Sequence, residues 1–472
     1  MTGPVLWNDR DAAAATGGES LQSWSAFGVA FDSRQIAPGD LFVALNGETS
    51  DGHKYVGQAL DGGAAAAMVA RTFDHGHPAP LLLVPDTMAG LNDLARAARA
   101  RCAGRICAIT GSVGKTGTKE MLHHVLARQG AAHVSEKSFN NHVGTPLSLA
   151  RMPAATRFGV FEIGMNAPGE IAPLSGLVQP NIAVITTIEM VHGATFDGID
   201  GIAAEKADIF NGLTEDGVAV INGDSAFADY LTQCAIDAGA ARIVRFGETD
   251  GCDVRLLDWR LGDRGTVVKA DVFGRSIEYQ LGFWGRHQAL NSLAVLAVVV
   301  LMDADVDQAA AALSSVAPPP GRGQRHRATI DGGDVLVIDE SYNCSPAALH
   351  AALGVLRATP VGDGGRRVAV IGDMLELGDQ SAALHVALAE QILESADLVV
   401  LIGDEVAHTK QALPAERCVA HVQAASDALA PVVDVLRAGD VVMVKGSRRV
   451  GLETVVEALL RQGAAQPMVG NG

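Results

Sequence analysis

Short apolar runs alternate with longer Ala- and Leu-rich stretches from one end of the chain to the other. The short runs have the length of buried β-strands, and the longer stretches have the length of helices. This alternation is typical of βαβ units, so we predict an α/β fold built on mostly parallel sheets. The clearest strand predictions are residues 40–45, 105–109, 158–163, 182–187, 217–222, 335–339, 367–372, 398–403 and 441–445.

Helices are expected between these strands. A helix followed by a strand is predicted within residues 55–70, and further helices are predicted over 87–101 and from Thr116. The longest apolar stretch, residues 293–302, is far shorter than the ~20 residues that span a bilayer. We therefore predict a buried helix there.

Two features divide the chain into domains. Residues 317–323 contain three successive prolines, which lack N–H donors and fix φ, so this run fits neither a helix nor a central strand. The strand at 105–109 leads directly into a glycine-rich loop, which indicates a domain start near Ala103. Because 472 residues exceed one hydrophobic core, we predict three domains. These are a small α/β N-terminal domain (1–102), a central parallel-sheet domain (103–320) and a doubly wound, Rossmann-like C-terminal domain (321–472).

Charge and composition narrow the possible partners. The chain has 36 Lys and Arg against 54 Asp and Glu, a net charge of -18. This charge repels nucleic acid and anionic membrane surfaces, so we expect neither as a partner, and an anionic substrate needs a local basic cluster. The six cysteines form no C-x-x-C pair, which argues against a zinc knuckle or a disulfide framework. The first ten residues lack the segments of a signal peptide, so we expect a cytoplasmic protein.

A phosphate-binding loop is the strongest chemical signal. The strand at 105–109 is followed by Thr110-Gly111-Ser112-Val113-Gly114-Lys115-Thr116 and then by a helix. In such a loop the glycines allow close backbone approach, the N–H groups face the anion, the lysine adds positive charge and the threonine offers a hydroxyl to Mg²⁺. The usual spacing places a further glycine where Ile109 stands, so this loop is a shortened variant. The alternative is an ordinary glycine turn before a helix.

Three side chains outside the loop are candidates for a metal site. Glu162 ends the strand at 158–163, and His192 follows the strand at 182–187. Binding residues in parallel sheets gather at these carboxyl ends, and Mg²⁺ bound to phosphates commonly takes one or two carboxylates. Lys206 lies in a predicted helix. For each of the three, an ordinary structural or solvent-exposed role is the alternative.

The loop and several longer segments resemble the Mur ligases, the family that builds the peptide stem of bacterial peptidoglycan. The resemblance spans the whole chain and implies a three-domain fold with a P-loop ATPase-like central domain and an ATP-dependent carboxylate–amine ligase activity. The matching segments are Thr110 to Thr116 with Thr118-Lys119-Glu120, residues 140–147, residues 161–166, and Gly285-Arg286-His287 with Asn291.

Three C-terminal segments narrow the resemblance to one member of the family. Residues 339–343, 372–378 with His385, and 444–448 resemble the family member that adds D-alanyl-D-alanine, and the Asp-Asn-Pro motif of the diaminopimelate-adding member is missing. The resemblance therefore implies that D-alanyl-D-alanine is joined to UDP-N-acetylmuramoyl-tripeptide through an acyl phosphate, in peptidoglycan precursor synthesis. It implies ATP and two Mg²⁺ ions as cofactors. We expect a monomer.

The resemblance also assigns roles around the nucleotide. Asn291 matches the adenine contact, Asp339 and Glu340 match the ribose-contacting acid, and either Arg322 or Arg325 matches the nucleotide-contacting arginine. The expected metal positions are Thr116, Glu162, His192 and Lys206, with Lys206 carrying a CO₂-derived carbamate, and the expected catalytic residues are Lys115, His192 and Lys206. The expected ATP-binding residues are Gly111, Ser112, Val113, Gly114, Lys115, Thr116, Gly117, Asn291, Arg322, Asp339 and Glu340.

Substrate-binding positions follow from the same resemblance. The N-terminal positions resemble a uridine-nucleotide segment and would otherwise be ordinary surface residues, and His385 and Lys445 have the same alternative. The expected substrate-binding residues are Ser33, Arg34, Asn46, Asp51, His53, Asn140, Asn141, Tyr342, Asn343, His385 and Lys445.

Departures from the family pattern and rival functions complete the prediction. Gly117 stands where threonine is frequent, and Cys344-Ser345 stands where alanine and asparagine are common. One rival is folylpolyglutamate or cyanophycin-type ligation, which residues 32–53 and 341–343 disfavour. The other is a non-enzymatic nucleotide-binding subunit or P-loop switch, which retention of the expected metal positions disfavours.

Overall fold

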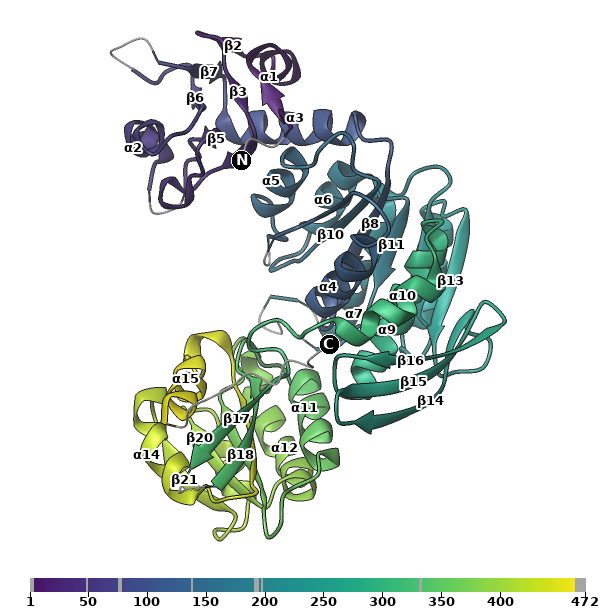
Figure 1. The fold of residues 1–472 in the computed structure, drawn as a ribbon, viewed down its shortest axis with the longest axis vertical. Helices are drawn as coiled ribbons and strands as arrows, with labels where there is room; N and C mark the ends of the chain where they lie inside the picture. Colours follow the sequence, from purple (N-terminus) through teal and green to yellow (C-terminus); the bar gives the residue numbers. More distant parts are fainter. Residues whose placement is uncertain are drawn as a thin grey trace.

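The computed structural model describes residues 4–47, 50–74, 79–136, 139–190, 195–196, 198–330 and 333–462. Three larger sheets follow one another along the chain, within residues 19–84, 105–281 and 324–445. Figure 1 shows them as three bodies, with the N-terminal body at the top and the C-terminal body at the bottom. The predicted α/β class with mostly parallel sheets is confirmed, while the limits of the three domains stay a prediction.

The N-terminal sheet is small and almost entirely parallel. Its strands are β2 (Glu19–Ser20), β4 (Gly28–Ala30), β5 (Asp40–Val43), β6 (Ala66–Ala70) and β7 (Leu81–Val84), beside a separate pair of β1 (Trp7–Asn8) and β3 (Ser25–Ala26). The order is β2-β7-β6-β5-β4, and within this sheet β2 is the antiparallel strand. Its helices are α1 (Asp9–Thr16), α2 (Val56–Asp61) and α3 (Thr87–Ala100).

The central sheet places the phosphate loop in its middle. Its parallel strands are β8 (Arg105–Thr110), β9 (Ala132–Val134), β10 (Phe158–Glu162), β11 (Ile182–Ile185), β12 (Val218–Asn222) and β13 (Arg242–Gly247). The order β13-β12-β11-β8-β10-β9 puts β8 between β10 and β11. All residues of β10 and β11 are buried, as expected for strands covered on both faces. The carboxyl ends of these three strands therefore meet at one edge.

Helices cover both faces of the central sheet. One face packs against α4 (Lys115–Leu126), α9 (Arg286–Leu301) and α10 (Val306–Ala312), and the other against α6 (Ile171–Val178), α7 (Gly198–Ala207) and α8 (Ala228–Asp237), while α5 (Gly144–Ala150) contacts α3. The apolar stretch predicted to be a buried helix lies in α9, which confirms that prediction. Across the described residues, none of the helices combines the length and the apolar character needed to cross a bilayer.

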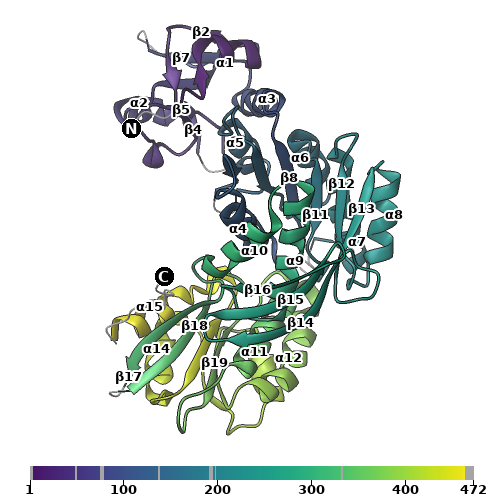
Figure 2. The same ribbon diagram turned by 45° about the vertical axis from the view of Figure 1, so that its right-hand side comes forward.

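The pattern of apolar runs misses a three-stranded extension of the central sheet. The extension consists of β14 (Val254–Gly262), β15 (Gly265–Val272) and β16 (Arg275–Leu281). β14 continues the sheet in parallel beyond β13, whereas β15 and β16 pair antiparallel (Figure 2). Buried and solvent-facing residues alternate along β15 and β16, so polar residues interrupt the apolar runs.

The C-terminal sheet is the predicted doubly wound sheet with additional edge strands. Its strands are β17 (Gln324–Ile330), β18 (Gly333–Glu340), β19 (Arg367–Gly372), β20 (Leu398–Ile402), β21 (Cys418–Val422) and β22 (Val441–Lys445), in the order β17-β18-β22-β19-β20-β21. The mostly polar β17 pairs antiparallel with β18, and the other pairs are parallel. Its helices are α11 (Pro346–Ala358), α12 (Ser381–Ser395), α13 (Ala407–Ala412), α14 (Ala425–Val435) and α15 (Glu453–Gln462).

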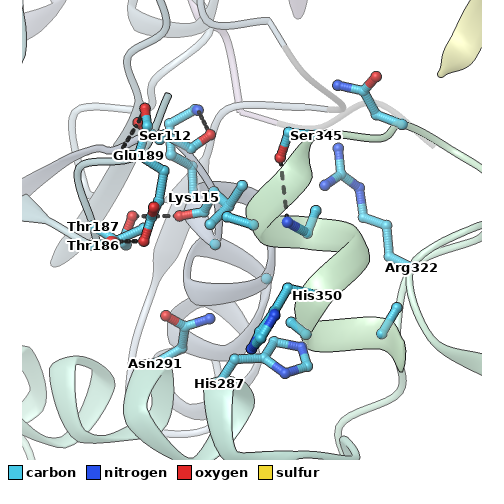
Figure 3. Close-up of a pocket in the computed structure, with 18 of the residues that line it drawn as sticks. Ser112, Lys115, Thr186, Thr187, Glu189, His287, Asn291, Arg322, Ser345 and His350 are labelled. Atoms are coloured by element: carbon cyan, nitrogen blue, oxygen red, sulfur yellow. Dashed lines mark hydrogen bonds between the residues drawn. The ribbon is translucent and has the colours of Figure 1, made fainter. Parts of the chain in front are cut away.

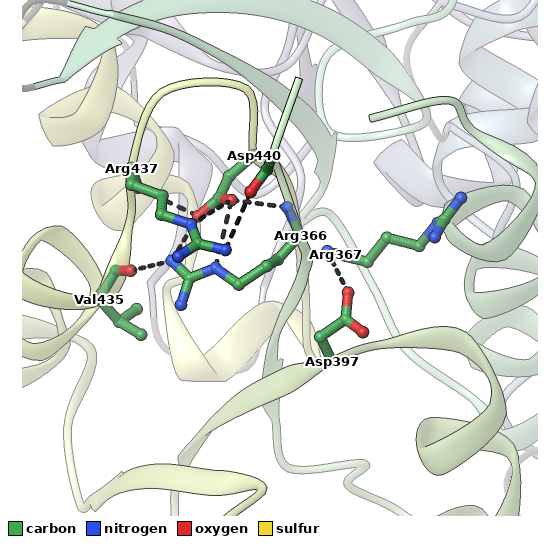
Figure 4. Close-up of polar contacts among 7 residues, drawn as sticks. Arg366, Arg367, Asp397, Val435, Arg437 and Asp440 are labelled. Carbon is green, nitrogen blue, oxygen red and sulfur yellow. Dashed lines mark hydrogen bonds and ion pairs between the residues drawn. The ribbon is translucent and has the colours of Figure 1, made fainter. Parts of the chain in front are cut away.

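A buried carboxylate fixes the amino-terminal end of β22. Asp440 accepts hydrogen bonds from the backbone N of Arg366 at 2.7 Å and of Arg437 at 3.0 Å. Its carboxylate also forms an ion pair with the Arg366 guanidinium at 2.8 Å (Figure 4). Lys445 ends the same strand, roughly 16 Å away at the rise of an extended chain. The cluster therefore holds the sheet at the end opposite the phosphate loop.

Candidate active site

The phosphate loop connects the end of β8 to the start of α4, as the sequence predicts. Gly111 has φ +146° and Gly114 has φ +90°, a region of backbone conformation that favours glycine. A Cβ atom on Gly111 would lie 1.9 Å from Thr186 Oγ1, and one on Gly114 would lie 3.0 Å from the Asn291 side chain. The loop therefore needs both glycines to pack against the end of β11 and against α9.

The first turn of α4 offers backbone N–H groups to an anion. Gly114 precedes the helix, and no side chain among the described residues caps it. The first N–H groups of a helix lack partners within the helix, and its N-terminus carries a partial positive charge. Phosphate groups are suited to this position.

Lys115 lies folded back over the loop. Its Nζ donates to the carbonyl oxygen of Gly111 at 2.6 Å and of Ser112 at 3.3 Å. Burial lowers the pKa of Lys115, while the nearby Glu162 carboxylate raises this pKa and Arg322 lowers it. An incoming phosphate would bring further negative charge to this half-buried cation.

Glu162 connects the loop to the neighbouring strand. Its side chain is buried, at 1% exposure, and both of its oxygens are bonded. Oε2 accepts from Thr116 Oγ1 at 3.0 Å, and Oε1 accepts from Asn140 Nδ2 at 2.8 Å. The structure thus brings together two expected metal ligands, Thr116 and Glu162, and one expected substrate-binding residue, Asn140, held by hydrogen bonds within the central domain.

The oxygen atoms of Thr116 and Glu162 fit a magnesium ion. Mg²⁺ prefers oxygen ligands and commonly takes one or two carboxylates while retaining water and phosphate oxygens. Among the described residues, no group of three or more His, Cys, Asp or Glu side chains could hold a metal by itself. The set therefore fits an ion that is completed by nucleotide phosphates. Of the two other expected ligands, His192 lies outside the described residues, and Lys206 is described below.

A cavity of ≈ 1130 Å³ opens between the central and C-terminal domains and includes the phosphate loop. Figure 3 shows Ser112 and Lys115 on one side, His287 and Asn291 on α9, and Ser345 and His350 on the opposing α11 side. This volume is large enough for a small-molecule ligand, since ligand pockets typically measure about 300–1,000 Å³. The predicted residues that line it are Ser112, Val113, Gly114, Lys115, Thr116, Gly117, Asn140, Glu162, Asn291, Arg322, Glu340, Tyr342, Asn343 and Lys445.

The C-terminal side of the cavity is centred on an ion pair. Lys445 Nζ lies 3.4 Å from Glu340 Oε2 and donates to the Asn343 carbonyl oxygen at 3.0 Å. Burial raises the pKa of Glu340, and the charge of Lys445 opposes this rise. The Arg322 guanidinium lies 4.2 Å from the centre of the Tyr342 ring. A basic cluster therefore faces the phosphate loop, as an anionic substrate requires.

The structure separates the two arginines that the sequence leaves as alternatives. Arg322 lines the large cavity, and its charge lowers the pKa of Lys115. Arg325 lies over the ring of Trp284 at 4.4 Å, outside this lining. This geometry favours Arg322 as the residue that contacts the nucleotide.

Lys206 is buried beside the cavity and does not line it. Its side chain is 2% exposed, and Nζ donates to the Met165 sulfur at 3.7 Å. Burial lowers the pKa of Lys206 well below its ordinary value, and the charge of Lys115 lowers it further, against the effect of Glu205. Lys206 is therefore a buried residue, and the alternative of a solvated lysine is wrong.

Other predicted residues have structural contacts instead of positions on the cavity wall. Asp339 accepts from Ser341 Oγ at 2.6 Å and from the backbone N of Gly321 at 3.1 Å. Asn141 caps the start of α5 by accepting from the backbone N of Gly144 at 2.9 Å. Gly111 supports the loop from behind, against Thr186. The nucleotide- and substrate-binding roles of these residues stay predictions.

His385 is fully buried, which corrects the alternative of a surface residue. Its Nε2 accepts from the backbone N of Met374 at 3.2 Å, and its Nδ1 donates to the Ser381 carbonyl oxygen at 2.8 Å. Both ring nitrogens are therefore occupied. The residue supports the loop that follows β19, where Leu375 lines the cavity, and its contact with a substrate stays a prediction.

The predicted N-terminal residues lie apart from this cavity. Arg34 is paired with Asp32 at 2.8 Å, and its side chain is 81% exposed. His53 contacts Asp51 Oδ1 through Nδ1 at 2.7 Å and accepts from a backbone N through Nε2. Ser33 donates to Gln58, and Asn46 forms a β-bridge with Asp51. Of the predicted segment, residues 48 and 49 lie outside the described residues.

The sequence prediction missed several residues on the cavity wall. Glu189 follows β11 and exchanges two hydrogen bonds with Ser112, and burial raises its pKa. The rule that selected Glu162 and His192 from the ends of strands also selects Glu189. Burial, assisted by Lys445, lowers the pKa of His287 to about 4. Trp259 in β14 also lines the cavity. It could not be predicted as a cavity residue, because the apolar pattern does not predict β14.

Comparison with known proteins agrees with this geometry. Three family models match consecutive parts of the chain: the Mur ligase family catalytic domain at 27–97, the Mur ligase middle domain at 109–299 and the Mur ligase glutamate ligase domain at 321–448. The chain belongs to the Mur ligase family. Two relatives carry the name UDP-N-acetylmuramoyl-tripeptide--D-alanyl-D-alanine ligase. The protein from Rickettsia prowazekii is 30% identical, over 96% of this chain and 99% of its own length. The protein from Escherichia coli is 33% identical, over 92% and 94%.

Solved structures of Mur ligases have the same fold. A crystal structure of MurF from Acinetobacter baumannii has a TM-score of 0.85 at 28% identity and covers 96% of this chain and 99% of its own. MurF from Thermotoga maritima in complex with ADP has a TM-score of 0.78 at 27% identity, over 92% and 97%. A folylpolyglutamate synthase from Mycobacterium tuberculosis shares the fold alone, with a TM-score of 0.61 at 20% identity.

Proposed function

We propose that this Mur ligase joins D-alanyl-D-alanine to UDP-N-acetylmuramoyl-tripeptide and converts ATP to ADP and phosphate. The observation that carries the proposal is the single cavity in which the phosphate loop and Glu162 face Arg322 and Lys445. Relatives that match nearly the whole chain are named for this reaction, and one structural relative is a complex with ADP. The first point supports the proposal against folylpolyglutamate or cyanophycin-type ligation, and the second supports the use of ATP.

The first step activates a carboxylate. An oxygen of the tripeptide carboxylate attacks the γ-phosphorus of ATP, the bond to the bridging oxygen breaks, and ADP leaves. Lys115 Nζ and the N–H groups at the start of α4 would stabilise the charge on the transferring phosphoryl group. Thr116 and Glu162 would hold Mg²⁺, which neutralises phosphate charge when bound. The central domain thus acts by position and electrostatics.

The second step forms the amide. The amine of D-alanyl-D-alanine attacks the carbonyl carbon of the acyl phosphate, the carbon–nitrogen bond forms, phosphate leaves and the nitrogen loses a proton. Lys445 and Asn343 would contact the dipeptide, since they face the phosphate loop from the C-terminal domain. The N-terminal domain, through Arg34 and its neighbours, would hold the uridine diphosphate by a charge-assisted contact.

Lys206 belongs to the proposal as the carrier of a carbamate. A neutral amine attacks CO₂ and loses a proton, so a lysine becomes an anion. The buried position of Lys206 and its lowered pKa favour the neutral form that this reaction needs. The carbamate and His192 would then serve a second Mg²⁺ ion.

Phosphate release from ATP tests the proposal. We expect release with UDP-N-acetylmuramoyl-tripeptide that rises strongly when D-alanyl-D-alanine is added, with one phosphate for each amide formed. Release that ignores the dipeptide, or that requires glutamate and a folate instead, would contradict it. A cytoplasmic location and a monomeric state are part of the same proposal, and light scattering of the purified chain checks the second.

A further inference from the structure

A half-buried arginine joins the C-terminal domain to the central domain beside the nucleotide cavity. Arg325 lies in β17, and its guanidinium carbon lies 4.4 Å from the centre of the Trp284 ring. Trp284 belongs to the central-domain segment between β16 and α9. The same guanidinium donates to Thr359 Oγ1 at 3.0 Å, and Thr359 directly follows the last residue of α11. One side chain therefore holds three segments from two domains.

The contact between Arg325 and Trp284 contains buried polar atoms that lack hydrogen-bond partners in the described part of the chain. No carboxylate among the described residues forms an ion pair with Arg325, and burial lowers its pKa to about 10. The Nε of Arg325 and the indole Nε1 of Trp284 are buried, and neither has a hydrogen-bond partner in the described part of the chain. Buried polar groups without partners cost free energy. An apolar pair would connect the domains without leaving such groups unpaired.

On the C-terminal side, Arg325 is linked to the cavity through Arg322. The backbone N of Gly323, between the two arginines, donates to the Asp339 carbonyl oxygen at 2.8 Å. The backbone N of Gly321 donates to the Asp339 carboxylate at 3.1 Å. Residues 321–325 are thus fixed to β18 as one unit, and a shift of Arg325 moves Arg322.

On the central side, the junction continues into the helix that carries Asn291. Gly285 follows Trp284 with φ +109°, and a Cβ atom there would lie 2.6 Å from Val355 Cγ2 of α11. The two domains therefore approach closely at this point. α9 begins at the next residue and presents Asn291 to the cavity.

We propose that Arg325 is a positioning residue, whose stack on Trp284 fixes how the C-terminal half of the nucleotide cavity meets the central half. The inference rests on the proposed function for the identity of the ligand, ATP. Arg325 does not line the cavity. Arg325 therefore affects nucleotide binding through Arg322 and α11.

Affinity for ADP, measured by displacement of a fluorescent ATP analogue, tests this proposal. Arg325→Met keeps a long side chain but removes the planar cation, and we expect at least tenfold weaker ADP binding. Arg101→Met is the matched control. Arg101 lies over Trp7 at 4.0 Å within the N-terminal domain, and its Nε is also buried without a partner in the described residues. Trp7 Nε1 donates to the Ala150 carbonyl oxygen of the central domain at 2.8 Å, so this stack lies beside another domain junction. We expect a similar loss in Tm for both variants, but ADP affinity within twofold of wild type for Arg101→Met.

A double-mutant cycle separates the stack from other effects. Trp284→Leu should weaken ADP binding as Arg325→Met does, Trp284→Phe should retain affinity within threefold, and the double variant should be no weaker than the single variants. Arg325→Lys, which keeps the charge without the plane, carries the test if the methionine variant does not fold, and we expect threefold to tenfold weaker binding.

Three outcomes would overturn the positioning role. These are wild-type ADP affinity in Arg325→Met or Arg325→Lys, equal losses in the Arg101 control, and additive losses in the cycle. Failure of the proposed function looks different, because phosphate release by the wild-type protein would then ignore D-alanyl-D-alanine while the ADP comparison remained valid.

Discussion

Replacing Glu162 with glutamine separates the chemistry of the carboxylate from its packing. The side chain keeps its shape, so its Oε1 can still accept from Asn140 and its Nε2 can donate to Thr116 Oγ1. Hydrogen bonds to a charged group contribute about 1.5–3 kcal/mol and neutral ones about 0.5–1.5 kcal/mol. Exchanging two such bonds costs roughly 2 kcal/mol of unfolding free energy, which corresponds to a fall in Tm of roughly 4–8 °C for a domain of this size.

The effect of Glu162→Gln on turnover should be far larger. The substitution removes the carboxylate proposed to hold Mg²⁺ and the charge that raises the pKa of Lys115. Loss of one group that stabilises developing charge costs ~10²–10³-fold in kcat. We therefore expect phosphate release to fall by that factor, with a higher Mg²⁺ concentration needed for half-maximal rate.

The buried carboxylate of Asp440 provides the matched control (Figure 4). Asp440→Asn breaks the pair with Arg366 and should cost ~3 kcal/mol of unfolding free energy. Its turnover should stay within twofold, because the residue lies at the end of β22 opposite the cavity. Both variants are assayed well below their Tm values. Glu162→Gln that retains more than a third of wild-type turnover at saturating Mg²⁺, or Asp440→Asn that loses as much as Glu162→Gln, would refute the reasoning.

Three further predictions concern residues in or beside the same cavity. Lys206→Ala should lose at least ~100-fold in phosphate release, with partial recovery on adding acetate or propionate, and a variant that keeps its turnover would contradict the carbamate. His287 has a folded pKa of about 4, below the unfolded value of ~6.5, so it contributes stability above pH 6.5 that is lost as the pH falls toward 4, by roughly 2–3 kcal/mol. His287→Gln should remove that part of the pH dependence in urea unfolding, and an unchanged difference between pH 7.5 and pH 4.5 would contradict the assignment. Gly114→Ala combines φ +90° with a Cβ 3.0 Å from Asn291, so ADP should bind at least tenfold more weakly by fluorescence displacement, and unchanged binding would show that the loop adapts.

The sequence predicts those parts of the site that depend on local order along the chain. The phosphate loop is a contiguous motif, and Glu162 follows from its place at the end of a buried strand. The α/β class could also be predicted, because long apolar runs mark strands that are buried on both faces. The structure confirms this class. Half-buried strands such as β15 and β16 lack such runs, so their polar positions conceal them.

Burial and partners of single side chains could not be predicted, because both depend on segments distant in the sequence. His385 is an example: its sequence surroundings allow a surface residue, while packing of α12 buries it completely. Arg325 is another, since its stack on Trp284 joins two domains. The choice between Arg322 and Arg325 needed the relative placement of those domains, which no local pattern contains.

The contacts divide the site into two halves that are each ordered without the other. Glu162 is held by Thr116 and Asn140 within the central domain, whereas Lys445 is held by Glu340 and Asn343 within the C-terminal domain. These contacts do not determine how the central half of the site is placed relative to the C-terminal half. A nucleotide that touches both halves binds best to the arrangement in which they face each other, so it favours that arrangement by its difference in affinity. Residues inside either half should therefore affect phosphate binding or turnover through their own contacts, and residues at the junction should act through the placement of the two halves.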